Sequence, residues 1–286
     1  LSKHDLTGTN LIGATLSYAK FSSTGLMGKD LSSANLSNVD LSKHDLTGTN
    51  LSDTFLLRTN LSGMDLRSTI LTGADFRYAN LSESKLPDSL LVNNNFDYAE
   101  LKHINFAGKD LSGSSFKQAN IEGLDMQNTN LYEADFIQVD FTKIKNKSLA
   151  GADLTDTSFA HSNLSGVNLA GTILDETNFW KADLSGVDFT VADAVIDKLS
   201  FIDAILPDSN FEGVDLSPKQ QYFQVYENKA HLNNLDAFSL AKNLISAKHH
   251  ILIISTEVRG NDLAVNYVFF NNFAHANLEN ANFKNA

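Results

Sequence analysis

The sequence predicts a solenoid, a fold in which one short structural unit repeats along the chain. Every fifth residue from Leu1 through Phe141 is Leu, Phe, Ile or Met, which makes 29 successive positions without an exception. Helices repeat every 3.6 residues and strands every 2.0, so a strict period of five must come from a larger repeating unit. Because the repeat is unbroken over this stretch, we expect one elongated body rather than several globular domains.

The composition excludes several classes of protein. The 286 residues include no cysteine, so neither a disulfide framework nor a cysteine-based metal site can form, and a reducing cytosol is compatible. The longest apolar run, Ile251 to Ile254, is far shorter than the ~20 residues of a membrane span. A formal charge of −12 argues against direct binding to nucleic acid, whose phosphates attract Lys and Arg. The same charge suits either solubility or contact with a basic protein groove.

The repeats share an internal pattern. Pentads such as Ala14-Thr15-Leu16-Ser17-Tyr18 and Ala74-Asp75-Phe76-Arg77-Tyr78 place a small residue two positions before a large apolar centre. This pattern resembles the pentapeptide-repeat family over about 250 of the 286 residues. The resemblance implies an all-β fold, a right-handed quadrilateral β-helix with four pentads per coil. In this fold the central residue and the small residue both point inward.

The sequence supports a coil of 20 residues independently. The segment LSKHDLTGTNL at residues 1–11 recurs at residues 41–51, an offset of two whole coils. When central residues are sorted by side of the coil, positions 76, 96, 116 and 136 are all Phe, and position 11 and every twentieth residue after it up to 131 are all Leu. Ladders of like residues are typical of stacked, interdigitating layers.

The small inward positions are less regular, and their exceptions cluster. Of the 29 such positions from His4 to Ile144, nine are not Ala, Ser, Thr or Val, and six of these nine fall on one side of the coil. We predict that this side bulges and forms the interaction surface; the alternative is that larger residues are tolerated at a coil corner. Lysines at inward positions of the neighbouring side must reach solvent or a carboxylate. The candidate interaction surface comprises His4, Lys29, His44, Met64, Ile104, Lys109, Leu124 and Ile144, with the outward carboxylates of Asp5, Asp45, Asp65 and Asp125.

Two slips interrupt the repeat of residues 1–216. At residues 142–148 the period shifts by three, in a loop that holds Lys143, Lys145 and Lys147, and at residues 190–195 it shifts again. Both are predicted to be insertion loops. The sequence begins and ends inside a repeat, at Leu1 and near Phe283, so we expect it to be a fragment of a longer protein.

Residues 217–250 are predicted to form a small α-helical insertion. Ser217, Pro218 and Gln220 fit a capping box, which predicts a helix over about 217–228, and apolar residues at helical spacing predict a second over about 233–248. Pentapeptide repeats then resume over residues 251–286. The helical hairpin is therefore either an insertion between coils or a link to further coils, and it either marks the functional side or covers an open edge.

The sequence contains no recognisable catalytic or cofactor motif. It lacks phosphate-binding, dinucleotide and zinc-protease signatures, and its Ser, Asp and His residues follow the pentad rather than a catalytic order. The adjacent pair His249-His250 is typical of a helix end rather than of a metal site, and His4 and His44 are two coils apart, too far to share a zinc ion. We predict no enzyme activity, no cofactor and no metal in this chain.

The expected function is a non-catalytic scaffold that binds a protein partner. Among pentapeptide-repeat proteins the chain is most similar to secreted bacterial effectors in which a helical linker follows the repeats, so we expect a cytoplasmic protein or one secreted into a host cell. The alternative is an acidic DNA mimic that acts on DNA gyrase. Its negative stripe is interrupted by Gly25, Lys85 and Asn105. A purely structural rod is a third hypothesis, and an uncapped terminal coil would favour end-to-end association.

Overall fold

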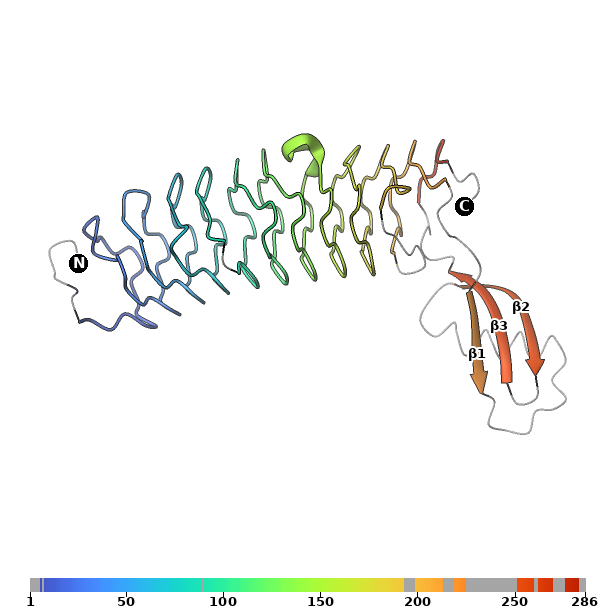
Figure 1. Cartoon of the computed structure of the whole chain (residues 1–286), viewed down its shortest axis with the longest axis horizontal. Coiled ribbons are helices and arrows are strands. Elements are labelled where there is room, and N and C mark those ends of the chain that lie inside the picture. Colours follow the sequence, from blue (N-terminus) through green and yellow to red (C-terminus); the bar gives the residue numbers. More distant parts are fainter. Residues whose placement is uncertain are drawn as a thin grey trace.

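The computed structural model describes residues 6, 8–88, 90–192, 199–212 and 276–282, together with the backbone of three strands near the C-terminus. The repeats form a long rod of stacked coils (Figure 1). Parallel β-bridges join residues 20 apart, as in Thr15 to Asn35 and Asn35 to Phe55, so one coil holds four pentads.

Each coil has four sides, which we number by their central residues. Side 1 contains Leu6 and every twentieth residue after it, side 2 starts from Leu11, side 3 from Leu16 and side 4 from Phe21. Beyond the first insertion the four sides continue at Leu149, Leu154, Phe159 and Leu164. The residue before each centre and the two after it are the outward positions.

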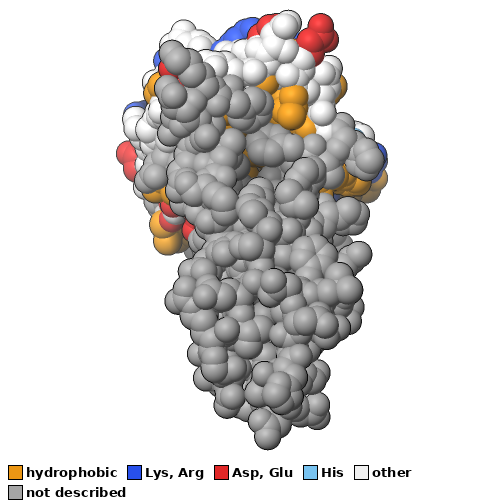
Figure 2. Space-filling model, turned by 90° about the vertical axis from the view of Figure 1, so that its right-hand side faces the viewer, with side chains coloured by type: hydrophobic (Ala, Val, Ile, Leu, Met, Phe, Trp, Pro, Cys, Tyr) orange, Lys and Arg blue, Asp and Glu red, His pale blue; other side chains and the backbone are white. Residues whose placement is uncertain are grey.

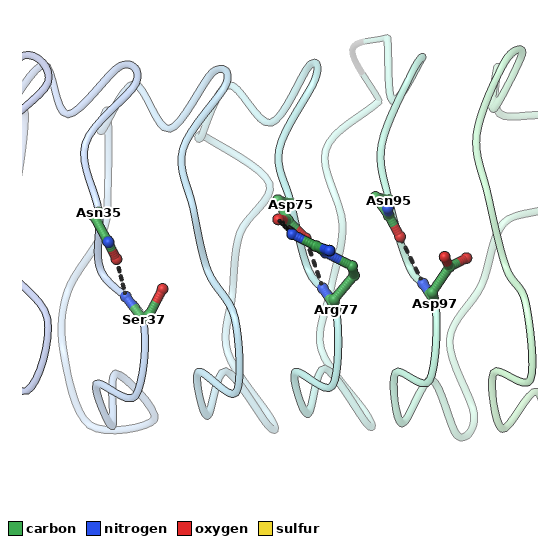
Figure 3. Close-up of polar contacts among 6 residues, drawn as sticks. All are labelled: Asn35, Ser37, Asp75, Arg77, Asn95 and Asp97. Carbon is green, nitrogen blue, oxygen red and sulfur yellow. Dashed lines mark hydrogen bonds and ion pairs between the residues drawn. The ribbon is translucent and has the colours of Figure 1, made fainter.

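Most of the described pentads turn in the same way. The carbonyl of the central residue accepts a hydrogen bond from the N–H three residues on, as Leu16 does from Ala19 at 3.0 Å, and the second residue after the centre has a positive φ, as in Tyr18 at 59°. An Asn or Asp before the centre accepts a bond from the N–H two residues on, which fixes the turn. Figure 3 shows this bond three times along side 3, between Asn35 and Ser37, Asp75 and Arg77, and Asn95 and Asp97.

The interior of the rod is filled by the central residues, as the sequence predicted. All the central residues described from Leu6 to Phe141 are buried. The Phe ladder of side 3 continues across the first insertion, with successive rings stacked at centroid distances of 4.6–5.6 Å. This ladder comprises Phe76, Phe96, Phe116, Phe136, Phe159, Phe179 and Phe201.

The small inward residues include hydroxyls that bind the preceding coil. Thr54 donates to the carbonyl of Leu31 at 2.9 Å, and Thr129 donates to the carbonyl of Phe106 at 3.0 Å. A buried hydroxyl without a partner would be costly, so these bonds explain why Thr and Ser alternate with Ala inside the tube.

The first slip holds two short 3-10 turns, η1 (Phe141–Lys143) and η2 (Lys145–Lys147), which project from the rod (Figure 1). Bridges that cross it, such as Asp140 to Asn163, join residues 23 apart, so three residues are added to this coil. Bridges across the second slip, such as Asp183 to Ile205, join residues 22 apart. Residues 193–198 of that loop lie outside the described residues.

The C-terminal region differs from the prediction. Strands β1 (Lys219–Gln224), β2 (Ile251–Arg259) and β3 (Asp262–Phe269) form an antiparallel sheet in the order β1-β3-β2 (Figure 1). The first predicted helix is therefore wrong over Lys219–Gln224, where pairing with β3 overrides the capping signal. The second predicted helix lies outside the described residues, and the residues described contain no α-helix.

The predicted return of the pentads from residue 251 is also wrong over β2 and β3. These strands are rich in β-branched and aromatic residues, which suit an antiparallel pair and meet a five-residue period by coincidence. The coil resumes only at the end, where Asn277 and Asn282 bridge to Ile205 and Asn210. Because these partners lie 72 residues apart rather than 20, the sheet belongs to an insertion within the solenoid.

Candidate interaction surface

Four of the predicted surface residues lie inside the rod. Met64, Ile104, Leu124 and Ile144 are at most 6% exposed and pack in the core. The prediction that they form a contact surface is wrong, because the interior of side 1 accommodates large side chains at these inward positions. His4 and Asp5 lie outside the described residues.

Side 1 does widen beside His44. The chain at residues 22–27 makes two successive turns, with N–H to carbonyl bonds from Gly25 to Ser22 at 3.1 Å and from Met27 to Thr24 at 3.3 Å, and Thr24 is exposed instead of inward. An open groove of about 800 Å³ lies there, lined by His44 and Arg67 among others.

The imidazole of His44 lies at this groove without a polar partner. It is half-buried, its ring meets Phe21 edge-on at 6.3 Å, and neither ring nitrogen has a hydrogen-bond partner. The groove brings His44 together with the carboxylates of Asp45 and Asp65.

The predicted carboxylates of side 1 are engaged within the chain. Asp65 forms an ion pair with Arg67 at 2.5 Å, and the hydrogen bond from Arg67 lowers the pKa of Asp65 to about 2. Burial alone would raise the pKa of Asp125, but hydrogen bonds from Lys145 at 2.7 Å and from Gln127 outweigh burial and lower it. Asp45 accepts the Thr47 N–H at 2.9 Å. Two of the three described carboxylates are therefore neutralised by a cation of the same side.

Both inward lysines find oxygen partners. The ammonium of Lys29 donates to the carbonyl of Leu6 at 2.8 Å. That of Lys109, whose side chain is 12% exposed, donates to the carbonyl of Pro87 at 2.9 Å and to Asp88 at 2.7 Å. A carbonyl holds each amine at the rod surface, and Asp88 also holds that of Lys109. These bonds reduce the availability of both amines to a partner.

Replacing Lys109 by Met should destabilise the protein by about 1 kcal/mol, because the aliphatic stem still packs but the Pro87 carbonyl loses its ammonium donor. Asp88→Asn is the matched control and should leave the free energy of unfolding unchanged, since Asp88 is fully exposed and solvent screens its charge. Chemical denaturation of both variants checks this. A larger loss for Asp88→Asn would mean that the ion pair, and not the carbonyl bond, holds Lys109.

The sequence prediction missed an aromatic surface on side 3. Among the described residues, six aromatic side chains are substantially exposed, and five of them occupy outward positions of this side; the sixth, Tyr132, is on side 2. Sorting the outward positions at intervals of 20 residues would have found this signal. The five residues are Tyr18, Phe55, Tyr78, Tyr98 and Trp180.

Charge also differs between the sides. The described outward positions of side 2 carry eight carboxylates and neither Lys nor Arg, whereas those of side 3 carry four cations and four carboxylates. On side 2 these are Asp30, Asp53, Asp110, Glu133, Asp153, Asp156, Asp175 and Glu176. On side 3 they are Arg58, Arg77, Lys117 and Lys181 with Asp75, Asp97, Asp135 and Asp203. The strongest acidic side is therefore side 2, not the predicted side 1.

Viewed from the C-terminal end, hydrophobic, acidic and basic side chains lie interspersed over the described part of the surface (Figure 2). Within the described ranges no cluster of His, Cys, Asp and Glu could hold a metal ion. A search of the same ranges finds no helix of the length and apolar character that a membrane span needs.

The repeats identify the family. The sequence profile of the pentapeptide repeats matches eight copies, in residues 1–28, 26–53, 45–82, 74–108, 110–145 and 152–190. The chain belongs to the pentapeptide-repeat family. Pentapeptide-repeat proteins fold as right-handed quadrilateral β-helices, which confirms the predicted fold class for the repeats, and they are generally non-catalytic.

Several solved pentapeptide-repeat structures are similar to this chain. HetL, involved in heterocyst differentiation regulation in the cyanobacterium Nostoc sp. strain PCC 7120, is 26% identical, with 74% of this chain and 86% of HetL covered and a TM-score of 0.26. QnrB1, a plasmid-mediated fluoroquinolone resistance protein, is 17% identical, with 70% and 82% covered and a TM-score of 0.19. A protein of the Arabidopsis thaliana thylakoid lumen is 24% identical, with 42% and 66% covered and a TM-score of 0.17. No curated protein matches the sequence.

Proposed function

We propose that this pentapeptide-repeat chain is a non-catalytic scaffold that binds a protein partner through the outside of the rod. The observation that carries the proposal is the filled interior, in which the central residues are buried and the inward hydroxyls described above bind the preceding coil. A filled interior favours the four sides, which are held rigid by coil-to-coil bridges, as the binding surface. A rigid surface loses little entropy when it binds.

The arrangement of the acidic groups does not favour the DNA mimic. Mimicry of a duplex needs a continuous row of free negative charge. On side 1 Asp65 and Asp125 are paired with Arg67 and Lys145, and on side 2 two successive coils between Asp53 and Asp110 carry no outward carboxylate. The η1 and η2 turns also interrupt the rod. We expect no inhibition of gyrase supercoiling by the purified protein.

The effector hypothesis loses one of its supports. The similarity to effectors with a helical linker relied on a helix after residue 216, and Lys219–Gln224 is a strand. We propose the scaffold without assigning it to a bacterial effector. A translocation assay with a reporter fused to the full-length protein would test secretion into a host cell.

Affinity capture with one variant for each side tests the scaffold. The wild-type chain and three of the four variants should retain a genuine partner, and the variant altered on the side that binds this partner should lose it. If no bait retains any protein from bacterial and host lysates, the proposal is contradicted. The charge-altering pairs are Asp45→Lys with Asp88→Lys on side 1, Glu133→Lys with Glu176→Lys on side 2, Arg58→Glu with Lys181→Glu on side 3, and Glu83→Lys with Glu100→Lys on side 4.

A further inference from the structure

Side 3 carries an ordered row of exposed aromatic side chains. The five aromatic residues at the outward positions of this side are 37–74% exposed. The other three sides, where described, have a single exposed aromatic residue, Tyr132. Tyr78 and Tyr98 stack at 4.7 Å, and the guanidinium of Arg58 lies 5.0 Å from the Tyr78 ring. Further along, Trp180 meets His161 at 4.8 Å and the ammonium of Lys181 at 4.8 Å.

These contacts order the side chains before any partner arrives. Tyr, Trp and Arg are enriched among the few residues that dominate binding energy in protein interfaces, and side chains that are already held in place lose little entropy on docking. Because the faces of Tyr78 and Tyr98 cover each other, a sugar ring cannot stack between them. Side 3 is thus suited to bind a protein surface.

The charges of side 3 suit a second copy of this chain. A two-fold symmetric interface brings the same patch of both subunits together, so the patch must complement itself. Side 3 has as many cations as carboxylates, whereas the eight carboxylates of side 2 would repel a second side 2. Between two rods of charge −12, association is least opposed where the net charge of the contact is zero.

The rod geometry provides a specific register. Asp97 and Lys117 occupy the same outward position of neighbouring coils, directly after Phe96 and Phe116. A two-fold axis that crosses the rod between these coils sets Asp97 of each copy opposite Lys117 of the other. It also sets Tyr98 opposite Gln118. Asp75 falls opposite Asp135, but Asp75 is already paired with Arg77 at 2.6 Å.

We propose that two copies associate side by side and antiparallel through side 3. From Tyr18 to Trp180 the face spans eight coil steps of about 4.8 Å, or about 40 Å. With a width of about 15 Å it would bury about 600 Å² per copy, at the lower end of specific interfaces. The dimer should therefore form at micromolar concentrations. This inference does not depend on the scaffold function, since sides 1, 2 and 4 stay accessible in the dimer.

Sedimentation velocity of the purified chain, from low to high micromolar concentration, tests the proposal. The wild type should shift from one copy to two, and Tyr78→Ser with Tyr98→Ser should raise the dissociation constant at least about tenfold. Tyr132→Ser on side 2 is the control and should leave it unchanged. A wild-type chain that stays monomeric throughout would overturn the proposal, and so would a dimer insensitive to the double change on side 3, which would point to end-to-end association.

A charge swap tests the antiparallel register. Asp97→Lys alone and Lys117→Asp alone should each weaken the dimer, because each sets like charges opposite one another. Both changes together should restore it, since every contact again joins opposite charges. Asp97 also accepts bonds from Ser115 and from the Lys117 N–H within its own chain, so a local disturbance would persist in the combined variant. Failure of the combined variant to recover would refute this register.

Discussion

Leu91→Asp is expected to destabilise the repeat by at least about 4 kcal/mol. Leu91 has no exposed surface and lies between Leu71 and Leu111, which are equally buried. Its carbonyl also accepts bonds from the Asn94 amide at 2.9 Å and from the Ser114 hydroxyl at 3.2 Å, so the backbone cannot move outward without breaking them. The new carboxyl group is therefore trapped among leucines, and burial should raise its pKa.

Ser62→Asp is the matched control for this substitution. Ser62 occupies an outward position, and its hydroxyl donates to the Asn60 side chain at 2.8 Å. That bond is only partly buried, so solvent can replace it and its loss should cost under about 1 kcal/mol. Urea denaturation followed by circular dichroism measures both variants. Equal losses at the two positions would show that the central residues do not fill the rod.

The sequence predicted the rod because its physical cause is local and periodic. One turn geometry recurs every five residues, and the central residue of each pentad is apolar since it always meets the central residues of adjacent coils. Strands β1, β2 and β3 lack this regularity. There the pairing of β1 with β3 joins residues 38 to 48 positions apart, from Gln224 with Asp262 to Lys219 with Tyr267, and a capping signal at Ser217 cannot report such a distant partner.

The candidate surface was predicted less well than the fold. Met64 and Ile104 are large residues at small inward positions, and side 1 was predicted to bulge there into an interaction surface, but side 1 holds both side chains inside. Residue type alone does not reveal how much space two neighbouring coils leave. The aromatic side 3 is visible in the sequence once outward positions are compared across coils, because Tyr78 and Tyr98 lie 20 residues apart.

Phe116→Ala is expected to destabilise the protein by about 3–5 kcal/mol, the usual cost of removing a buried Phe. The ring is fully buried, stacks on Phe96 at 5.0 Å and on Phe136 at 4.6 Å, and meets Phe106 edge-on at 6.1 Å. Coils above and below are held at their spacing by backbone bonds, so the rod cannot collapse to fill the space. A cavity should remain and add to the lost burial.

Phe55→Ala provides the control on the same side, since Phe55 is 48% exposed and its removal opens no cavity; its cost should stay below about 1 kcal/mol. A double-mutant cycle of Phe116→Ala with Phe136→Ala isolates the stacking contact, and we expect a coupling of about 0.5–1.5 kcal/mol. Coupling between Phe116 and the distant Phe201 should be absent, because each coil contacts only its neighbours. Strong coupling over that distance would show that a change in one coil alters the packing of coils far along the rod.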